Sequence, residues 1–140
     1  MDHDRIVGVG IDLVEIAEIE RLLSDPGGHF LRRCFTEAER ATAGGETRDA
    51  RRLAGRFAVK EAVVKAIGTG WGDGIAWTDI EVLAAPSGAP FVTLHEGAAA
   101  AASHVRRWLV SISYAGAHAT AVAVAVGEPP ECGARARHGA

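Results

Sequence analysis

The sequence lacks the features of several large classes of protein. Two cysteines in 140 residues, Cys34 and Cys132, make no disulfide framework, and no Cys or His spacing matches a zinc site. A formal net charge of −3 leaves no broad basic surface for nucleic-acid phosphates, so we expect no nucleic-acid partner. Any metal that binds is then expected to be a hard ion held by oxygen ligands.

Long apolar runs are also missing. None approaches the roughly 18 residues of a membrane span, and the start, MDHDRIVGVG, lacks the basic and apolar regions of a secretory signal. We therefore expect a cytosolic protein that makes no use of a membrane. With 48% apolar residues the length suits one domain, predicted over residues 1–127 and followed by a disordered tail over 128–140.

The stretch Arg52–Gly70, RLAGRFAVKEAVVKAIGTG, predicts a long helix that is apolar on most of its circumference and therefore buried. One narrow strip carries Glu61 and Lys65, and another carries Arg56 and Lys60. Glu61 is then a buried or half-buried carboxylate, which stays ionised only beside a cation or hydrogen-bond donors. Glu61 and Lys65 could equally form a surface ion pair worth about 0.2–0.5 kcal/mol, and the helix alone favours neither interpretation.

Residues 6–12, IVGVGID, predict a strand with Gly8, Gly10 and Asp12 on one side. Glycine inside a strand often marks the close approach of another backbone or of a ligand, here on the side that carries Asp12. Asp12 also fits the N-cap of a following helix over residues 13–23. Taken alone, Asp12 is more often a cap than a ligand.

The remaining segments predict short elements around the long helix. A capping box, TEAE at Thr36–Glu39, begins a short helix, and residues 79–84 and 91–94 form a hairpin. A small helix over 96–104 leads to a second hairpin, 109–114 with 118–126, whose last strand alternates valine with alanine. We expect its valine side to meet a core and its alanine side a closely packed helix. The order predicts an α+β fold with an antiparallel sheet wrapped around the long central helix.

Asp12 and Glu61 gain meaning when they are considered together. If the first strand packs across the long helix, the two carboxylates meet, and a divalent ion would offset their repulsion. Mg²⁺ takes one or two carboxylates and completes its shell with water and phosphate oxygens. Lys60, Lys65 and the backbone of the glycine stop at residues 68–70 would donate to a pyrophosphate. The residues thus indicate metal-assisted phosphoryl transfer.

Four segments together resemble the holo-acyl-carrier-protein synthase type of 4′-phosphopantetheinyl transferase. They are GVGIDLVE at 8–15, CFTEAE at 34–39, LAGRFAVKEAVVKAIGTG at 53–70 and VSIS at 110–113. The resemblance implies the fold of that family and a Mg²⁺-dependent reaction. In it, phosphopantetheine passes from coenzyme A to a serine of an apo acyl carrier protein, and adenosine 3′,5′-bisphosphate is released.

The resemblance also implies roles for single residues. Asp12 and Glu61 would be the Mg²⁺ ligands, and Lys65 would complete the catalytic set by contacting the phosphates near the reacting centre. Further coenzyme A contacts are implied at Arg56, Lys60, Gly68, Thr69 and Gly70. A homotrimer is implied, with coenzyme A between neighbouring subunits. The base that accepts the serine proton stays unassigned.

The acidic carrier protein of such a system would dock on basic side chains near the first helix. Arg21, Arg32 and Arg33 are the candidates, and each could equally be a solvated surface arginine. The residues do not decide between a carrier of fatty-acid synthesis and one of polyketide synthesis.

Two residues depart from the pattern of the family. Tyr114 stands where the family usually has histidine, and tyrosine does not take up a proton near neutral pH as an imidazole does. Glu18 stands where relatives often carry a basic residue. An alternative is therefore a catalytically weak homologue that binds carrier protein or coenzyme A without transfer. A purely structural trimer is the least favoured alternative, because Glu61 has apolar surroundings.

Overall fold

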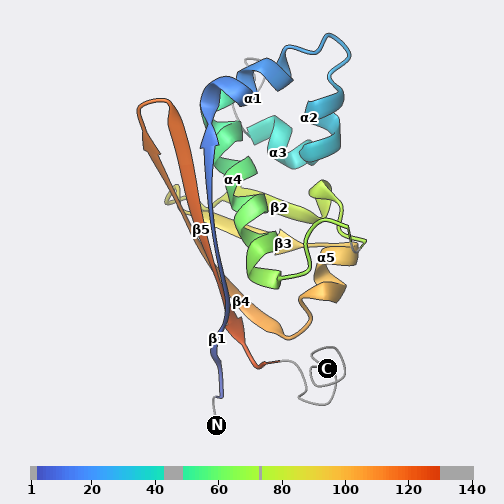
Figure 1. Cartoon of the computed structure of the whole chain (residues 1–140), viewed down its shortest axis with the longest axis vertical. Helices are drawn as coiled ribbons and strands as arrows, with labels where there is room; N and C mark the ends of the chain where they lie inside the picture. The colour runs from blue at the N-terminus through green and yellow to red at the C-terminus, as the bar shows by residue number, and fades with distance from the viewer. Residues whose placement is uncertain (1–2, 43–48, 73, 130–140) are drawn as a thin grey trace.

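The computed structural model of the chain describes residues 3–42, 49–72 and 74–129 (Figure 1). Its elements are β1 (Arg5–Glu15), α1 (Ile16–Leu23), α2 (His29–Cys34), α3 (Glu37–Thr42), α4 (Ala50–Ile67), the 3-10 helix η2 (Trp77–Asp79), β2 (Ile80–Ala84), β3 (Pro90–Leu94), α5 (Glu96–Ala101), β4 (Val105–Ala115) and β5 (His118–Gly127). The predicted α+β class is confirmed, with the antiparallel strands in two sheets: β1-β5-β4 and β2-β3. Most of the predicted tail, from residue 130 on, lies outside the described residues.

The long central helix forms because its two ends are capped and most of its surface is apolar. The Asp49 carboxylate accepts hydrogen bonds from the backbone N–H groups of Arg51 and Arg52 at its start. Gly68 ends the helix in the left-handed conformation, with φ 91°, and donates its N–H to the Val64 carbonyl. Figure 1 shows α4 against the long sheet, with α1 to α3 at one end and the β2-β3 hairpin across it. No helix in the described ranges is long and apolar enough to cross a bilayer.

Strand β1 lies with its backbone directly against α4. A Cβ atom on Gly8 would lie 2.2 Å from the Ala66 carbonyl oxygen, and one on Gly10 would lie 1.8 Å from that of Ala62. Only glycine allows this approach, so the expected close contact on the Asp12 side of the strand is confirmed. Asp12 therefore points towards α4.

The predicted boundary between the first strand and the first helix was wrong. The strand runs on to Glu15, α1 begins at Ile16, and Asp12 pairs with Ala121 inside the ladder instead of capping a helix. The physical reason is the partner strand, because β5 offers ladder partners as far as His118 and this pairing overrides the local capping propensity.

The two sides of the long sheet differ in what covers them. The alanines of β5 are buried towards α4, as expected, but Val122 and Val124 on the other side are only partly covered in the single chain. We call this side the outer face; its members include Val9, Ile11, Leu13, Leu109, Val122 and Val124. Val9, Ile11, Leu13 and Leu109 are 50–67% exposed. The expectation that a core covers the valines is wrong for the single chain.

A buried ion pair joins α3 to α4. The capping box is confirmed, because the Thr36 N–H donates to Glu39 Oε1 at 2.8 Å and the Glu39 N–H donates to Thr36 Oγ1 at 3.1 Å. The same carboxylate accepts from Lys60 Nζ at 2.9 Å, and neither side chain is exposed. Lys60 also donates to the carbonyls of Trp77 and Ile80. All three ammonium hydrogens are thus used inside the protein.

Candidate active site

Asp12 and Lys65 meet where β1 crosses α4. Lys65 Nζ lies 3.2 Å from Asp12 Oδ1 and donates to the Ile11 carbonyl at 2.9 Å. The Asp12 side chain is 16% exposed and that of Lys65 is 53% exposed, so the pair faces solvent on one side. Thr120 Oγ1 donates to the Asp12 carbonyl at 2.8 Å and ties this part of β1 to β5. Lys65 thus pairs with Asp12, and the interpretation of Glu61 and Lys65 as a surface ion pair was wrong.

Glu61 lies half-buried on α4, one turn before Lys65. Burial is the largest cause that raises the pKa of Glu61, and the negative charge of Asp12 raises it further. The Trp71 indole and the Lys65 ammonium act in the opposite direction. The carboxylates of Asp12 and Glu61 are thus brought close enough to repel one another, as the sequence predicted.

Two repelling carboxylates at the edge of solvent match the oxygen ligands that Mg²⁺ takes in proteins. The described part of the chain holds no group of three or more His, Cys, Asp or Glu residues that could bind a metal. An ion here would have two protein ligands and would need water or substrate oxygens for the rest, as Mg²⁺ sites commonly do. The residues therefore fit Mg²⁺, which would supply neutralisation of charge on a phosphate.

The structure separates Arg56 and Lys60 from this site. Lys60 is fully buried with all its donors used, so its assignment as a contact for a pyrophosphate does not fit its surroundings. Arg56 is also buried and donates to the Glu39 carbonyl and to Thr42 Oγ1, both at 2.9 Å. Burial lowers the pKa of Arg56. Because a helix turns by about 100° per residue, Arg56 points about 140° away from Glu61.

A cavity of about 600 Å³ lies on that other side of α4, and sequence reasoning missed it. It is lined by α4, the β2-β3 hairpin and β4, and its polar wall includes Arg51, Arg52, Arg56 and Tyr114. The Arg51 guanidinium stacks 4.4 Å above the Tyr114 ring, and the tyrosine hydroxyl reaches the backbone of Gly55. Three arginines around one cavity suit an anionic ligand. No local sequence signal brings β4 to this helix face.

The turn over residues 68–70 is exposed beside the end of α4. The Gly68 N–H is used by the helix cap, which leaves fewer donors than the sequence suggested. The C-terminal end of a helix also carries partial negative charge, so the dipole does not favour an anion here. Any anion contact must come from the backbone of Thr69 and Gly70.

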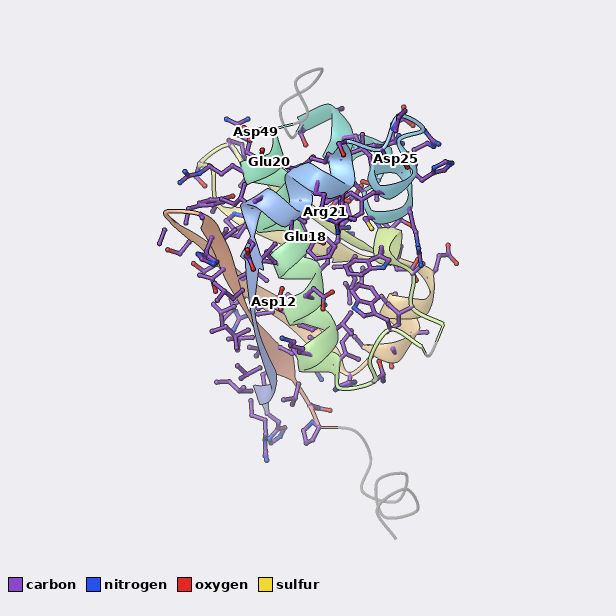
Figure 2. The ribbon with its side chains drawn as sticks, turned by 45° about the horizontal axis from the view of Figure 1, so that its top comes forward. Asp12, Glu18, Glu20, Arg21, Asp25 and Asp49 are labelled. Carbon is purple, nitrogen blue, oxygen red and sulfur yellow. The ribbon has the colours of Figure 1, made fainter. Side chains whose placement is uncertain are left out.

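The candidate docking arginines differ in their surroundings. Arg21 donates to Glu18 through Nε at 3.0 Å and through a second nitrogen at 2.5 Å, and both residues lie on α1 (Figure 2). Arg32 and Arg33 are exposed in the last turn of α2. Glu18, one of the two departures from the family pattern, therefore forms an ion pair with Arg21.

Comparisons with known proteins show the family of the chain. The family model of the 4′-phosphopantetheinyl transferase superfamily matches residues 8–124. A holo-[acyl-carrier-protein] synthase of Methylobacterium nodulans is 42% identical over 125 residues, which is 89% of each chain. A solved synthase of Helicobacter pylori in complex with coenzyme A has a TM-score of 0.75 at 32% identity, over 84% of this chain and 98% of that chain.

A second solved structure, the synthase of Bacillus anthracis in complex with coenzyme A (3′,5′-ADP), has a TM-score of 0.73 at 35% identity. It covers 88% of this chain and 98% of that chain. The chain therefore belongs to the 4′-phosphopantetheinyl transferase superfamily. Within that superfamily it is an enzyme of the holo-[acyl-carrier-protein] synthase type, and the expected fold of the family is confirmed.

Proposed function

We propose that the protein transfers the 4′-phosphopantetheine group of coenzyme A to a serine of an apo acyl carrier protein, with Mg²⁺, and releases adenosine 3′,5′-bisphosphate. The carrying observation is the meeting of Asp12, Glu61 and Lys65 at the crossing of β1 and α4. Asp12 and Glu61 would hold the metal. Lys65 forms an ion pair with Asp12 in the structure. When the ion binds Asp12, the Lys65 ammonium would leave this carboxylate and contact the diphosphate.

The chain contributes to the reaction mainly by position and charge. Phosphoryl transfer needs the hydroxyl and the leaving group in line and compensation of the charge that grows on the oxygens. β1 and α4 fix the backbones that carry Asp12 and Glu61 beside one another, because the two elements touch at Gly8 and Gly10. The site is therefore preorganised before substrate arrives.

The direct test incubates the protein with coenzyme A, Mg²⁺ and an apo acyl carrier protein, and the carrier is then weighed by mass spectrometry. We expect a gain of one phosphopantetheine that a chelator abolishes and added Mg²⁺ restores. Tight binding of carrier or coenzyme A without any mass gain would instead support the catalytically weak binding module. Carriers of fatty-acid and of polyketide synthesis should be compared, because neither is favoured by the residues.

We further propose a homotrimer in which coenzyme A lies between subunits. The outer face exposes a row of apolar side chains that a neighbouring copy would cover. Arg56 and its cavity point away from Glu61 on the same helix, so one ligand of moderate length reaches both only across a subunit boundary. The cavity of one subunit would then complete the metal site of the next, with Arg51 and Arg56 near the phosphates.

Mixed oligomers test this arrangement. Glu61→Gln removes the metal half of a site, and Arg51→Ala removes part of the cavity half, so each variant alone should be inactive or nearly so. Co-expressed subunits should recover activity, because about one quarter of randomly mixed interfaces pair two intact halves. A monomer by light scattering, or mixed oligomers no more active than the separate variants, would contradict the shared site.

Tyr114→His should raise turnover, because an imidazole with a pKa of about 6.5 can accept a proton near neutral pH. Burial raises the pKa of Tyr114, so the native hydroxyl does not serve as a base in that range. The measurement is kcat for carrier modification between pH 5.5 and 8, with Tyr114→Phe as a matched control that removes only the hydroxyl. An unchanged or lower kcat in the histidine variant would defeat this prediction.

For the carrier protein we propose contacts with Arg32 and Arg33, which are exposed and carry positive charge at the end of α2. Arg21 contributes only if it leaves Glu18. A cytosolic location of the reaction stays a prediction.

A further inference from the structure

Trp71 lies beside the candidate metal site, and the function proposed above leaves this residue unused. The turn that follows α4 reverses the chain, with Gly68 at φ 91° and Gly70 at φ 75°, and brings Trp71 back to the helix. Its ring packs against the core and stacks on Trp77, with 3.8 Å between the ring centroids. Trp77 stacks in turn on Phe57 of α4 at 4.7 Å. The position of the indole is thus fixed both by the turn after α4 and by its stacking on Trp77.

The polar atom of this indole is buried without an ordinary partner. Trp71 Nε1 is shielded from solvent and makes no hydrogen bond of normal length and angle within the described residues. A buried N–H without an acceptor is costly, and such a group in a native structure often has a role at a site. The acceptor that it influences is the Glu61 carboxylate, whose pKa the indole lowers against the effect of burial.

We propose that Trp71 is a positioning residue for Glu61, whose carboxylate it aims at the metal through the indole N–H. This inference rests on the proposed function, because it assigns Glu61 a Mg²⁺ ion to bind. A carboxylate that binds a metal through one oxygen still has acceptor capacity, and a donor there fixes its orientation. We expect the indole N–H to donate to the Glu61 oxygen that does not bind the ion.

Because Trp71 stacks on Trp77, substitutions in the same stack can distinguish the positioning role from simple packing. Trp71→Phe keeps an aromatic ring on Trp77 and removes the indole N–H, and Trp77→Phe is the matched control in the same stack. Outer partners of metal ligands typically change metal affinity or activity by about 10- to 100-fold when they are removed. We therefore expect Trp71→Phe to raise the Mg²⁺ concentration for half-maximal activity about tenfold or more. Trp77→Phe should leave it nearly unchanged.

A second readout does not depend on turnover. In ¹⁵N-labelled protein with Mg²⁺ alone, the indole N–H resonance of Trp71, assigned by its loss in Trp71→Phe, should shift downfield with the metal. The resonances of Trp77 and Trp108 should move less. The rise in melting temperature that Mg²⁺ gives the native protein should also shrink in Trp71→Phe.

The outcomes separate the inference from the function on which it rests. If the native protein modifies the carrier but Trp71→Phe and Trp77→Phe need the same Mg²⁺ concentration, the positioning role is overturned. A Trp71 resonance that ignores Mg²⁺ overturns it as well. If the native protein neither binds Mg²⁺ nor modifies any carrier, the proposed function itself fails. Equal losses in both variants, accompanied by equal losses of stability, would assign Trp71 to packing alone.

Discussion

Glu61→Gln should reduce carrier modification by about 10³-fold or more while the protein stays folded. The substitution keeps the shape of the side chain and removes the negative charge that would bind the metal. Asp12 alone would then hold the ion, with Lys65 still competing for the same carboxylate at 3.2 Å. The measurement is kcat/KM by carrier mass, with Glu37→Gln, an exposed acid on α3, as the control that should behave as the native protein.

The same variant should be at least as stable as the native protein at neutral pH. Burial and Asp12 raise the pKa of Glu61 in the folded state, so folding favours its protonated form. The stabilising contribution of the protonated group is complete below the unfolded pKa, near 4.5, and is lost as pH rises through the higher folded value. At pH 7 the ionised Glu61 therefore destabilises the metal-free fold, and glutamine relieves this.

The pH dependence gives the prediction its sign. Without Mg²⁺, the melting temperature of Glu61→Gln should equal or exceed that of the native protein at pH 7. The difference should shrink as pH falls through the folded pKa of Glu61 and should be smallest below 4.5, where the native carboxyl is protonated in both states. Added Mg²⁺ should stabilise the native protein more than the variant. A variant that keeps its activity, or one that melts far below the native protein at pH 7, would contradict the role given to Glu61.

The sequence predicted that Asp12 and Glu61 lie near one another, because the signals for this approach are local. Gly8 and Gly10 mark the close approach of β1, and Glu61 is a charge on an otherwise apolar helix. The periods of a strand and of a helix then suffice to turn Asp12 and Glu61 towards one another. Their meeting required only that β1 packs on α4, which the glycines themselves favour.

Other parts of the site depend on contacts between distant segments. The ion pair between Lys60 and Glu39 could not be predicted from the sequence of the long helix. Glu39 lies in another segment, and its place in the capping box already gave it a local role. The strand that continues beyond Asp12 is set by its pairing with β5, more than a hundred residues later. The place of Trp71 depends on the turn after α4, which two glycines with positive φ determine. Period and composition do not encode such pairings.

Lys60→Met should lower the free energy of unfolding by about 3–5 kcal/mol, because it leaves the Glu39 carboxylate buried without its cation. Neither side chain of the native pair is exposed, so water cannot replace the ammonium without opening α3 from α4. Burial lowers the pKa of Lys60, and the charge of Glu39 opposes this, as expected for a cation that depends on its partner. Urea unfolding of both proteins measures the difference.

The double variant Lys60→Met/Glu39→Gln separates the lost pair from the lost side chain. Glutamine is neutral and keeps one carbonyl oxygen, which can accept from one of the two backbone N–H groups, those of Thr36 and Val82, that donate at 2.8 Å to separate oxygens of Glu39. The double variant should therefore recover part of the stability that Lys60→Met loses, because no charge stays buried alone. The KM for coenzyme A of folded Lys60→Met should match the native value. A large rise in that KM with little loss of stability would show instead that Lys60 contacts the substrate. The three hydrogen bonds that Lys60 makes inside the protein argue against this outcome.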